Sequence, residues 1–550
     1  MLSFFKNKSQ FLTIAALFLT AAVSFYALFR IGGKVPKDLT PYKIVLKADK
    51  KQIKSDGIDK IKFTVYIYNK NNERLNGFIP MDYSIYINGV PLKSNYYTST
   101  EICESKAYAE YKKIKSNEIN FSQILSTNLP LIVMWQTNKK AETDKYAGRL
   151  TLYDSKNGRN SVMDSPVIDQ NIVYSERGKW SVTFPKKQYN IRFIDDFKKE
   201  IKFSVLNMPK DSEWVLNAPY ADKTLIKNFL AYTLGGQILE AKTDCRLVEV
   251  YMDTNYDGKL SENEYYGVYL LTEKIKRSNL NIEEAGNNIT GGYIIARDKT
   301  DKNDVYFTLP SEIYSIVHGK AFPFNHKLVY PSKANITDEQ LEYIKNYITN
   351  LNDKIHVLTD GINDYKDYLD INSYIDCVLI NEIFRNPDGF EFSTFFYKNV
   401  NGKLMSGPLW DFDIAGGTLL RKDGDYDNPE GFQVMYTEWT YYMLKDPVFV
   451  SAVIERYKNM RKTVFSDKNV ISLIDETVKY IDSGAVKRNF SRFPELFNGQ
   501  YNKSLNNIFA DTRTYDEEIN LLKNFLVNRL KWLDENIGSL CFFDKYRLDK

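Results

Sequence analysis

The sequence is poor in histidine and cysteine. Its 550 residues include only 3 histidines and 4 cysteines. No histidines stand at the spacing of an H-E-x-x-H motif and no C-x-x-C pair occurs, so a zinc site is not expected. Acid–base chemistry in this chain would therefore depend on carboxylates. The four cysteines are expected to be small buried residues or to form one disulfide.

The sequence also lacks an excess of charge of either sign. It has 74 lysines and arginines against 70 acidic residues, a net charge of +4. A nucleic-acid-binding chain would be more basic, so no nucleic-acid partner is expected. Aromatic residues make up 14% of the chain, which excludes disorder as its main state.

Only one long run without charge occurs. Residues 11–29 are 19 uncharged residues, and as a helix they would be about 28 Å long, close to the thickness of the hydrocarbon core of a membrane. Lys6 and Lys8 precede this run and Arg30 follows it. Residues 1–30 are therefore predicted to be a signal anchor or a signal peptide. The membrane would be a partner through residues 11–29, with the bulk of the chain extracytosolic, or secreted if the signal is cleaved.

The next region shows the alternation of β-strands. Residues 31–41 contain glycine and proline and are predicted to be a linker. Within 42–126, the segments KIVLKADKKQI, IDKIKFTVYIYN and DYSIYINGVPL alternate apolar and polar residues between turn signals. This pattern is typical of a β-sandwich, and the stretch resembles bacterial immunoglobulin-like repeats. We expect it to act as a spacer.

From residue 127 to 545 the pattern becomes mixed α and β. A capping box at Thr337–Gln340 and an N-cap at Asp370 mark two helix starts. The expected strands are 130–135, 147–153, 189–194, 246–252 and 266–271. The expected helices are 221–239, 337–356, 371–385, 446–463, 468–483 and 514–536.

One segment matches the calcium loop of an EF-hand. The stretch DTNYDGKLSENE, residues 253–264, fits D-x-[DN]-x-[DN]-G-x5-E at every fixed position. Its flanks read as strands, so the loop is expected at the tip of a β-hairpin. A metal-free acidic turn is the alternative. The predicted Ca²⁺ ligands are Asp253, Asn255, Asp257, Lys259 through its carbonyl, Ser261 and Glu264.

A second group of acids lies further along the chain. Asp388 begins the segment DGFEFSTFFYKN, and Asp411 follows 23 residues later in GPLWDFDIAGG. Asp411 and Asp413 are two residues apart, so in an extended segment they would project to the same side. Two such carboxylates suit a divalent cation such as magnesium. The alternative is a structural pair of aspartates.

A pair of lysines precedes a predicted strand. Lys186 and Lys187 stand just before an alternation in which Tyr189, Ile191 and Phe193 face a core. A lysine entering a strand at this point can reach a phosphate group. The alternative is that both lysines are solvated residues of an edge strand.

Several of these segments together resemble the spore-coat protein H (CotH) kinase family. They are FPKKQYNIRF, WVLNAPYADKTLIKNFLAYTL, YYGVYLLTEKI, NPDGFEFSTFFYKN and GPLWDFDIAGG. The resemblance implies an atypical protein-kinase-like fold of two lobes that binds ATP and phosphorylates a surface or coat protein. The fold class expected is α+β, with the β-sandwich and the membrane segment in front.

The resemblance also implies roles for individual residues. Lys187, or Lys186, would hold the phosphates of ATP, and Asp388 would be the catalytic aspartate. Asp411, with Asp413 beside it, would bind Mg²⁺ or Mn²⁺. The strand at 266–271 would lead into a hinge beside adenine that includes Glu273 and Ile275. Asp222, Lys227 and Asn228 match a family pattern on the helix in the αC position.

The chain departs from the kinase pattern at three points. No G-x-G-x-x-G precedes Lys186, and Arg177-Gly178 stands there instead. Ser393 occupies the place of the asparagine that binds a second metal ion in kinases. The helix at 221–239 contains no glutamate that could pair with the lysine. The nearest acid is Asp222, at the start of that helix. A non-catalytic pseudokinase that acts as a surface or coat protein is therefore an alternative, and a glycosidase with two carboxylates is a weaker one.

Overall fold

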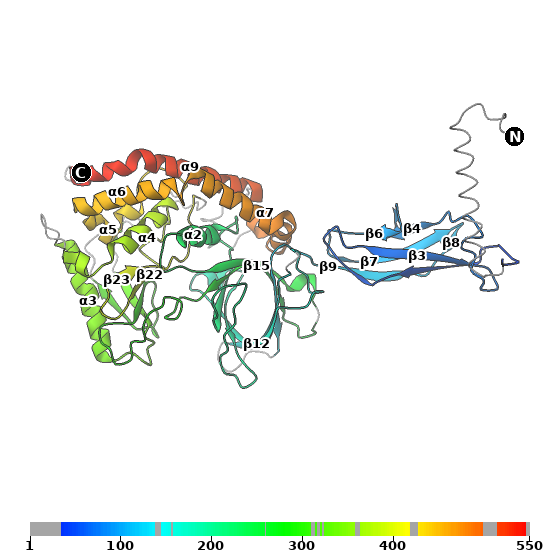
Figure 1. The fold of residues 1–550 in the computed structure, drawn as a ribbon, viewed down its shortest axis with the longest axis horizontal. Coiled ribbons are helices and arrows are strands. Elements are labelled where there is room, and N and C mark those ends of the chain that lie inside the picture. Colours follow the sequence, from blue (N-terminus) through cyan, green and yellow to red (C-terminus); the bar gives the residue numbers. More distant parts are fainter. Residues whose placement is uncertain are drawn as a thin grey trace, which may run out of the picture. The chain divides into compact units, whose positions relative to one another are not determined.

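A computed structural model describes residues 35–137, 145–155, 158–258, 260–309, 314–315, 320–321, 324–357, 364–417, 427–498 and 514–545. The chain divides into two compact units between Ser126 and Thr127. Strands and helices are mixed in the second unit (Figure 1), so the chain is an α+β protein. The predicted membrane segment at 11–29 lies outside the described residues. No helix among those described is long and apolar enough to cross a membrane.

The first unit consists of two sheets around one apolar core. Alternate residues of β3 (Ile61–Tyr68) are buried and pack with Phe121 of β9 (Ile119–Ile124), as the alternation in the sequence predicts. One sheet has the order β1 (Lys43–Ala48), β3, β6 (Tyr96–Tyr97). The other has the order β2 (Gln52–Lys54), β9, β7 (Cys103–Tyr111), β4 (Ser84–Ile87), β5 (Val90–Leu92), and β8 (Ile114–Lys115) pairs with β7.

The second unit begins with a closed barrel. The barrel closes because β10 pairs in parallel with β15, although the other neighbours are antiparallel. Tyr189, Ile191 and Phe193 face its core, as the alternation predicts. The strand order is β10 (Leu131–Gln136), β11 (Tyr146–Tyr153), β12 (Ile168–Arg177), β13 (Gln188–Phe193), β14 (Glu213–Asn217), β16 (Tyr265–Glu273), β15 (Cys245–Asp253).

The barrel corrects the strand order inferred from the kinase resemblance. We expected the lysine-bearing strand to be followed directly by a helix. Instead β14 lies between β13 and that helix, and it pairs with both β13 and β16. β14 is only five residues long and takes its place through pairing with β16, which is distant in sequence.

A second sheet follows the barrel. Its central strand β17 pairs with β22, about 100 residues later in the chain. The sheet has the order β18 (Tyr306–Leu309), β21 (Phe324–Tyr330), β17 (Tyr293–Arg297), β22 (Thr394–Lys398), β23 (Leu404–Ser406). A separate pair consists of β19 (Tyr314–Ser315) and β20 (Lys320–Ala321).

Helices pack against this sheet and share one large apolar cluster. In Figure 1, α7 extends from the layer of α6 and α9 toward the barrel strand β15. The α-helices are α2 (Lys227–Gly235), α3 (Asp338–His356), α4 (Ile371–Ile383), α5 (Glu438–Met443), α6 (Pro447–Lys462), α7 (Asp467–Arg492), α8 (Glu495–Asn498) and α9 (Tyr515–Asn536). Short 3-10 helices are η1 (Ser181–Thr183), η2 (Glu262–Glu264), η3 (Asp364–Asp367), η4 (Val434–Tyr436) and η5 (Ile537–Lys545).

Two predicted helices have different bounds in the structure. The helix expected at 221–239 is the shorter α2, because Leu225 has a left-handed φ of 66° and interrupts helical geometry before Lys227. The helix expected at 468–483 continues as α7 to Arg492, with a kink at Asp482, where φ is 61°. The capping box at Thr337 and the N-cap at Asp370 are confirmed.

A buried ion pair connects the helices to each other. Glu382 of α4 and Arg529 of α9 are fully buried and form an ion pair. Glu382 also accepts hydrogen bonds from the backbone N–H groups of Gln433 (2.9 Å) and Met435 (2.8 Å). Arg529 donates to the carbonyls of Pro429 (2.8 Å) and Gly431 (2.6 Å). Both charges are therefore fully hydrogen-bonded, which is the condition for burying them.

Arg529→Met should destabilise the protein by about 3–5 kcal/mol, because the carboxylate of Glu382 would stay buried without its partner. The free energy of unfolding from urea titration measures this loss. Lys354→Met is the control, since Lys354 pairs with Asp364 at the surface and its loss should cost less than about 1 kcal/mol. Equal losses in both variants would contradict the role of the buried pair.

Candidate functional site

The segment before α2 forms a turn around Asp222. The Asp222 carboxylate, 1% exposed, accepts hydrogen bonds from the backbone N–H groups of Thr224 (2.9 Å) and Lys227 (2.8 Å). It therefore accepts from the N–H of the first residue of α2. The ammonium group of Lys227 lies 3.9 Å from the same carboxylate. The family pattern Asp222, Lys227, Asn228 is thus a connected unit in space.

Helix α2 uses this unit to hold the segment around Asp413. The Asn228 side chain donates to the Asp413 carboxylate (2.8 Å) and accepts from the backbone N–H of Phe412 (2.7 Å). Lys227 donates to the carbonyl of Asp413 (3.0 Å). Residues that are nearly 200 positions apart in the sequence are fixed against one another, and Asp413 is only 8% exposed.

Asp411 has a left-handed backbone conformation, not the extended one that we expected. Its φ is 65°, so the argument that alternate residues share a side does not apply to it. Its backbone N–H donates to the hydroxyl of Tyr232 (3.1 Å), and its carboxylate accepts from the hydroxyl of Ser393 (3.2 Å). A left-handed aspartate held from both sides is the kind of strained residue that gathers at functional sites.

The two carboxylates repel each other electrostatically. Burial raises the pKa of Asp413 well above its usual range, and the charges of Asp411 and Asp222 raise it further. Burial and the charge of Asp298 also raise the pKa of Asp411, against the hydrogen bond from Ser393 and the charge of Arg177. Buried oxygen ligands with too little positive charge around them fit a divalent cation.

Of the two lysines, Lys186 is the one that lies beside these acids. It is 1% exposed, and its ammonium group donates to the carbonyl of Val268 (2.5 Å) and the side-chain oxygen of Asn489 (2.9 Å). Burial lowers the pKa of Lys186 to about 7, although the charges of Asp413 and Asp222 act in the opposite direction. Because this pKa is close to neutral pH, a charged group that binds nearby would change the protonation state of Lys186.

Lys187, our first choice for the phosphate-binding lysine, is in a different environment. Its ammonium group donates to the carbonyl of Val182 at the protein surface. The two lysines are consecutive at the entry to a strand, so their side chains point in opposite directions. The structure brings Lys186 into the charged cluster and leaves Lys187 outside it.

The partner of Lys186 comes from α7, which the sequence did not indicate. Asn489 is fully buried and its side-chain oxygen accepts from Lys186 and from the backbone N–H of Val268 (3.1 Å). This approach needs Gly267, because a Cβ there would lie 2.5 Å from that oxygen. Asn489 is thus a buried side-chain partner that holds Lys186 against β16.

Arg177 is a further cation near these acids, and the sequence analysis named it only as the residue before Gly178. It stands at the end of β12, half-buried, with its guanidinium group 5.4 Å from the ring centroid of Trp410. Its charge lowers the pKa of Asp411. The following Gly178 has a φ of 107°, so the chain turns sharply after this arginine.

Asp388 lies on a loop that is tied to Asp411. Asn386 accepts from the backbone N–H of Asp388 (3.3 Å) and donates to the carbonyl of Asp411 (3.4 Å). Phe390 and Ser393 on this loop have left-handed φ values of 64° and 49°. The loop therefore turns so that Ser393 contacts the Asp411 carboxylate, and half-buried Asp388 is brought into the same region.

The side chains of the predicted hinge already have partners within the protein. The Glu273 carboxylate accepts from the backbone N–H of Asp244 and from the Asn279 side chain, both at 3.0 Å. Ile275 packs against a separate apolar cluster that includes Leu280 and Ile282. A nucleotide contact at this place would therefore be made by the backbone.

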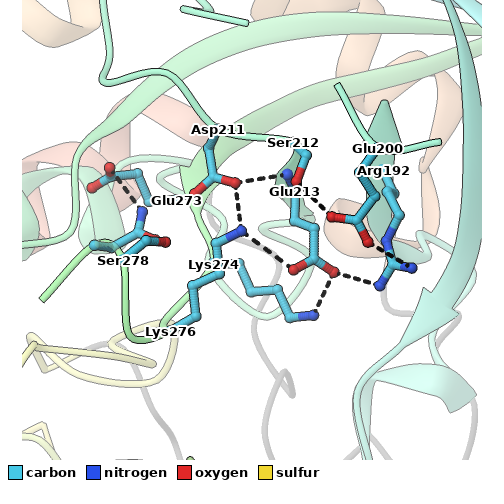
Figure 2. A network of polar contacts seen from close by, with 10 residues as sticks. Arg192, Glu200, Asp211, Ser212, Glu213, Glu273, Lys274, Lys276 and Ser278 are labelled. Atoms are coloured by element: carbon cyan, nitrogen blue, oxygen red, sulfur yellow. Dashed lines mark hydrogen bonds and ion pairs between the residues drawn. The ribbon is translucent and has the colours of Figure 1, made fainter. Parts of the chain in front are cut away.

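Ion pairs hold the segment after β16 in position. Figure 2 shows Lys274 and Lys276 pointing toward Glu213 and Asp211 at the start of β14. Lys274 lies 2.9 Å from Glu213, and Lys276 pairs with Asp211. Burial raises the pKa of Glu213, but Lys274, Arg192 and Lys276 together lower it to about 2. These ion pairs tie the segment after β16 to the start of β14.

The loop predicted to bind calcium joins β15 and β16, as a hairpin tip. It brings together Asp253, Asp257 and Glu264, whose ligand atoms lie within 4.8 Å of one another. Asn255 accepts from the backbone N–H of Asp257 (2.9 Å), and Ser261 bonds to Glu264. Lys259 lies outside the described residues.

The pKa of Lys186 leads to a prediction about stability. Unfolded lysine has a pKa of about 10.4, so the unfolded chain binds more protons than the folded one between about pH 7 and pH 10, and stability rises with pH there. Relative to Lys186→Met, wild-type protein should gain stability from about pH 6 to about pH 9. Melting temperatures of both proteins across this range test it. A constant difference between wild type and Lys186→Met across this range would contradict the lowered pKa.

One family model covers the segments that form this arrangement. The model of the CotH kinase protein family matches residues 175–533, which is more than half of the chain. The match includes Arg177, Lys186, α2, the Asp388 loop, the Asp411–Asp413 segment and Asn489. No curated protein matches the chain. On the family model, the chain belongs to the CotH kinase protein family.

Proposed function

We propose that the chain is a metal-dependent atypical protein kinase that transfers the γ-phosphoryl group of ATP to a serine or threonine hydroxyl of another protein. The observation that carries this proposal is the meeting of Lys186, α2 and the Asp411–Asp413 segment in one buried cluster. Phosphoryl transfer is catalysed mainly by positioning and by neutralising charge, and this cluster offers cations and metal-binding oxygens together.

Each group has a distinct part in the proposal. Lys186 would hold the phosphates of ATP, and Arg177 would supply a second positive charge nearby. Asp411 would hold a Mg²⁺ or Mn²⁺ ion, with Asp413 beside it and Ser393 on its carboxylate. When bound, that ion neutralises charge on the phosphates. Asp388 would orient the acceptor hydroxyl and take its proton.

We also propose that the protein acts outside the cytosol. The support is the apolar run at 11–29, which would hold it in a cell membrane unless it is cleaved. Its substrates would then be surface or coat proteins. The unit between the membrane segment and the kinase-like domain, with its two sheets, would act as a spacer of the immunoglobulin-like kind.

A specific observation favours the alternative of a pseudokinase. Ser393 replaces the asparagine that binds a second metal ion in kinases, and its hydroxyl already donates to Asp411. ATP binding without phosphate transfer would support this reading. A transfer assay with ATP and Mg²⁺ or Mn²⁺, followed by mass spectrometry of serine and threonine, separates the two functions.

The two lysines provide a matched test of ATP binding. Lys186→Met should weaken ATP binding roughly 10- to 100-fold, because a hydrogen bond to a charged group contributes about 1.5–3 kcal/mol. Lys187→Met should leave it unchanged, because its side chain bonds to Val182 at the surface. Calorimetric titration with ATP and Mg²⁺ measures both. Weaker binding in Lys187→Met alone would show that the lysines are assigned in the wrong order.

The aspartates should fail in different ways. Asp411→Asn removes metal-binding charge, so ATP binding and phosphoryl transfer should both fall. Asp388→Asn should still bind ATP while transfer drops about 10²- to 10⁴-fold, as expected for a lost general base. Binding and transfer are measured on the same preparations, and a thermal melt checks folding. Equal loss of ATP affinity in both variants would contradict these roles.

A further inference from the structure

The tip of the β15–β16 hairpin has acidic side chains that the proposed kinase reaction does not use. Asp253, the last residue of β15, and Glu264, the last residue of η2, are 2% and 4% exposed, and Asp257 between them is exposed. The ligand atoms of the three lie within 4.8 Å of one another. Like charges this close repel unless a cation lies between them.

One oxygen of this group has no hydrogen-bond donor. Glu264 Oε2 accepts from the backbone N–H (2.7 Å) and the hydroxyl (2.8 Å) of Ser261. Glu264 Oε1 is buried and has no partner. A buried carboxylate oxygen without a donor is costly, so this atom indicates a ligand. Ser261 holds the carboxylate in place, as outer partners do for metal ligands.

The backbone of the turn orients the remaining ligands. The Asp253 carboxylate accepts from the N–H groups of Tyr256 (2.7 Å) and Gly258 (3.0 Å). Both donor residues have left-handed φ values, 68° and 70°. The turn therefore curls around Asp253, and Asp257 comes back toward it.

We propose that the 253–264 turn binds one calcium ion. We also propose that this ion stabilises the first residues of β16, on which α7 docks. Three carboxylates leave a net charge of −1 after Ca²⁺ binds. A carboxylate that offers both oxygens in an irregular turn suits the variable geometry of Ca²⁺, whereas Mg²⁺ demands a near-ideal octahedron and keeps its water. This site is independent of the proposed kinase activity.

The second half of the proposal follows from what lies next to Glu264. The hydroxyl of Tyr265 donates to Glu249, and its carbonyl accepts from Arg492 of α7 (3.1 Å). Glu249 forms a bidentate ion pair with Arg488 of α7, at 3.0 and 2.8 Å. Gly267, two residues after Tyr265, has no side chain and therefore leaves room for the side-chain oxygen of Asn489. Fixing Glu264 therefore restrains the strand end that holds α7.

The test measures binding and protection rather than activity. Metal-free full chain is titrated calorimetrically with Ca²⁺ or Mg²⁺, and hydrogen exchange of residues 483–492 is followed with and without Ca²⁺. All measurements use the Asp411→Asn background, so that the kinase-site metal does not contribute. Glu264→Gln keeps the size of the side chain and removes its charge. Glu262→Gln is the matched control, because loop position 10 supplies no ligand in the pattern.

We expect one equivalent of Ca²⁺ to bind more tightly than Mg²⁺, and Glu264→Gln to weaken it at least about 100-fold, beyond the 10- to 100-fold loss typical of an outer partner. Glu262→Gln should bind normally. Ca²⁺ should slow exchange in residues 483–492 of the parent and not of Glu264→Gln. No binding, or equal binding by Glu264→Gln, would overturn the site. Protection confined to the turn would overturn the effect on α7.

Discussion

The side chain of Asn489 is the contact on which the arrangement of the second unit depends. Its one oxygen accepts from the ammonium group of Lys186 and from the backbone of β16. Asn489 belongs to α7, a helix whose first part packs in the large apolar cluster with α9. The same helix thus belongs to the helical core and holds a lysine of the barrel. Gly267 is required because any side chain there would occupy the space of this oxygen.

The charges around this contact are distributed unevenly. Two buried acids, Asp222 and Asp413, lie near Lys186 and Lys227, and the half-buried Asp411 lies near Arg177. The raised pKa values of Asp411 and Asp413 and the lowered pKa of Lys186 have the same primary cause, which is burial. Opposite charges are close, yet none is fully compensated. Such a cluster is costly for a folded protein and useful for a site that binds a metal ion and phosphates.

The structure offsets this cost elsewhere. Glu382 and Arg529 are also fully buried, but each has a complete set of hydrogen bonds, and the ion pairs of Lys274 and Lys276 hold the segment after β16. Near the site, Phe390, Ser393 and Asp411 have left-handed φ values, as do other residues elsewhere among those described. Ion pairs with complete hydrogen bonding thus surround a site whose charged groups have fewer partners. This is expected where a bound ligand supplies the missing partner.

The sequence by itself determined the local elements. Alternation predicted β13, β15 and β16, side-chain caps predicted α3 and α4, and spacing predicted the acidic hairpin tip, because these signals act between neighbouring residues. It also indicated the family, and within it Lys186, Asp388, Asp411 and the α2 residues. Only the tertiary structure placed Lys186, and not Lys187, near the buried acids, closed the barrel through β10 and β15, and brought Asn489 and Arg177 close to them. Those outcomes depend on contacts between residues far apart in the chain, for which a single sequence has no local signal.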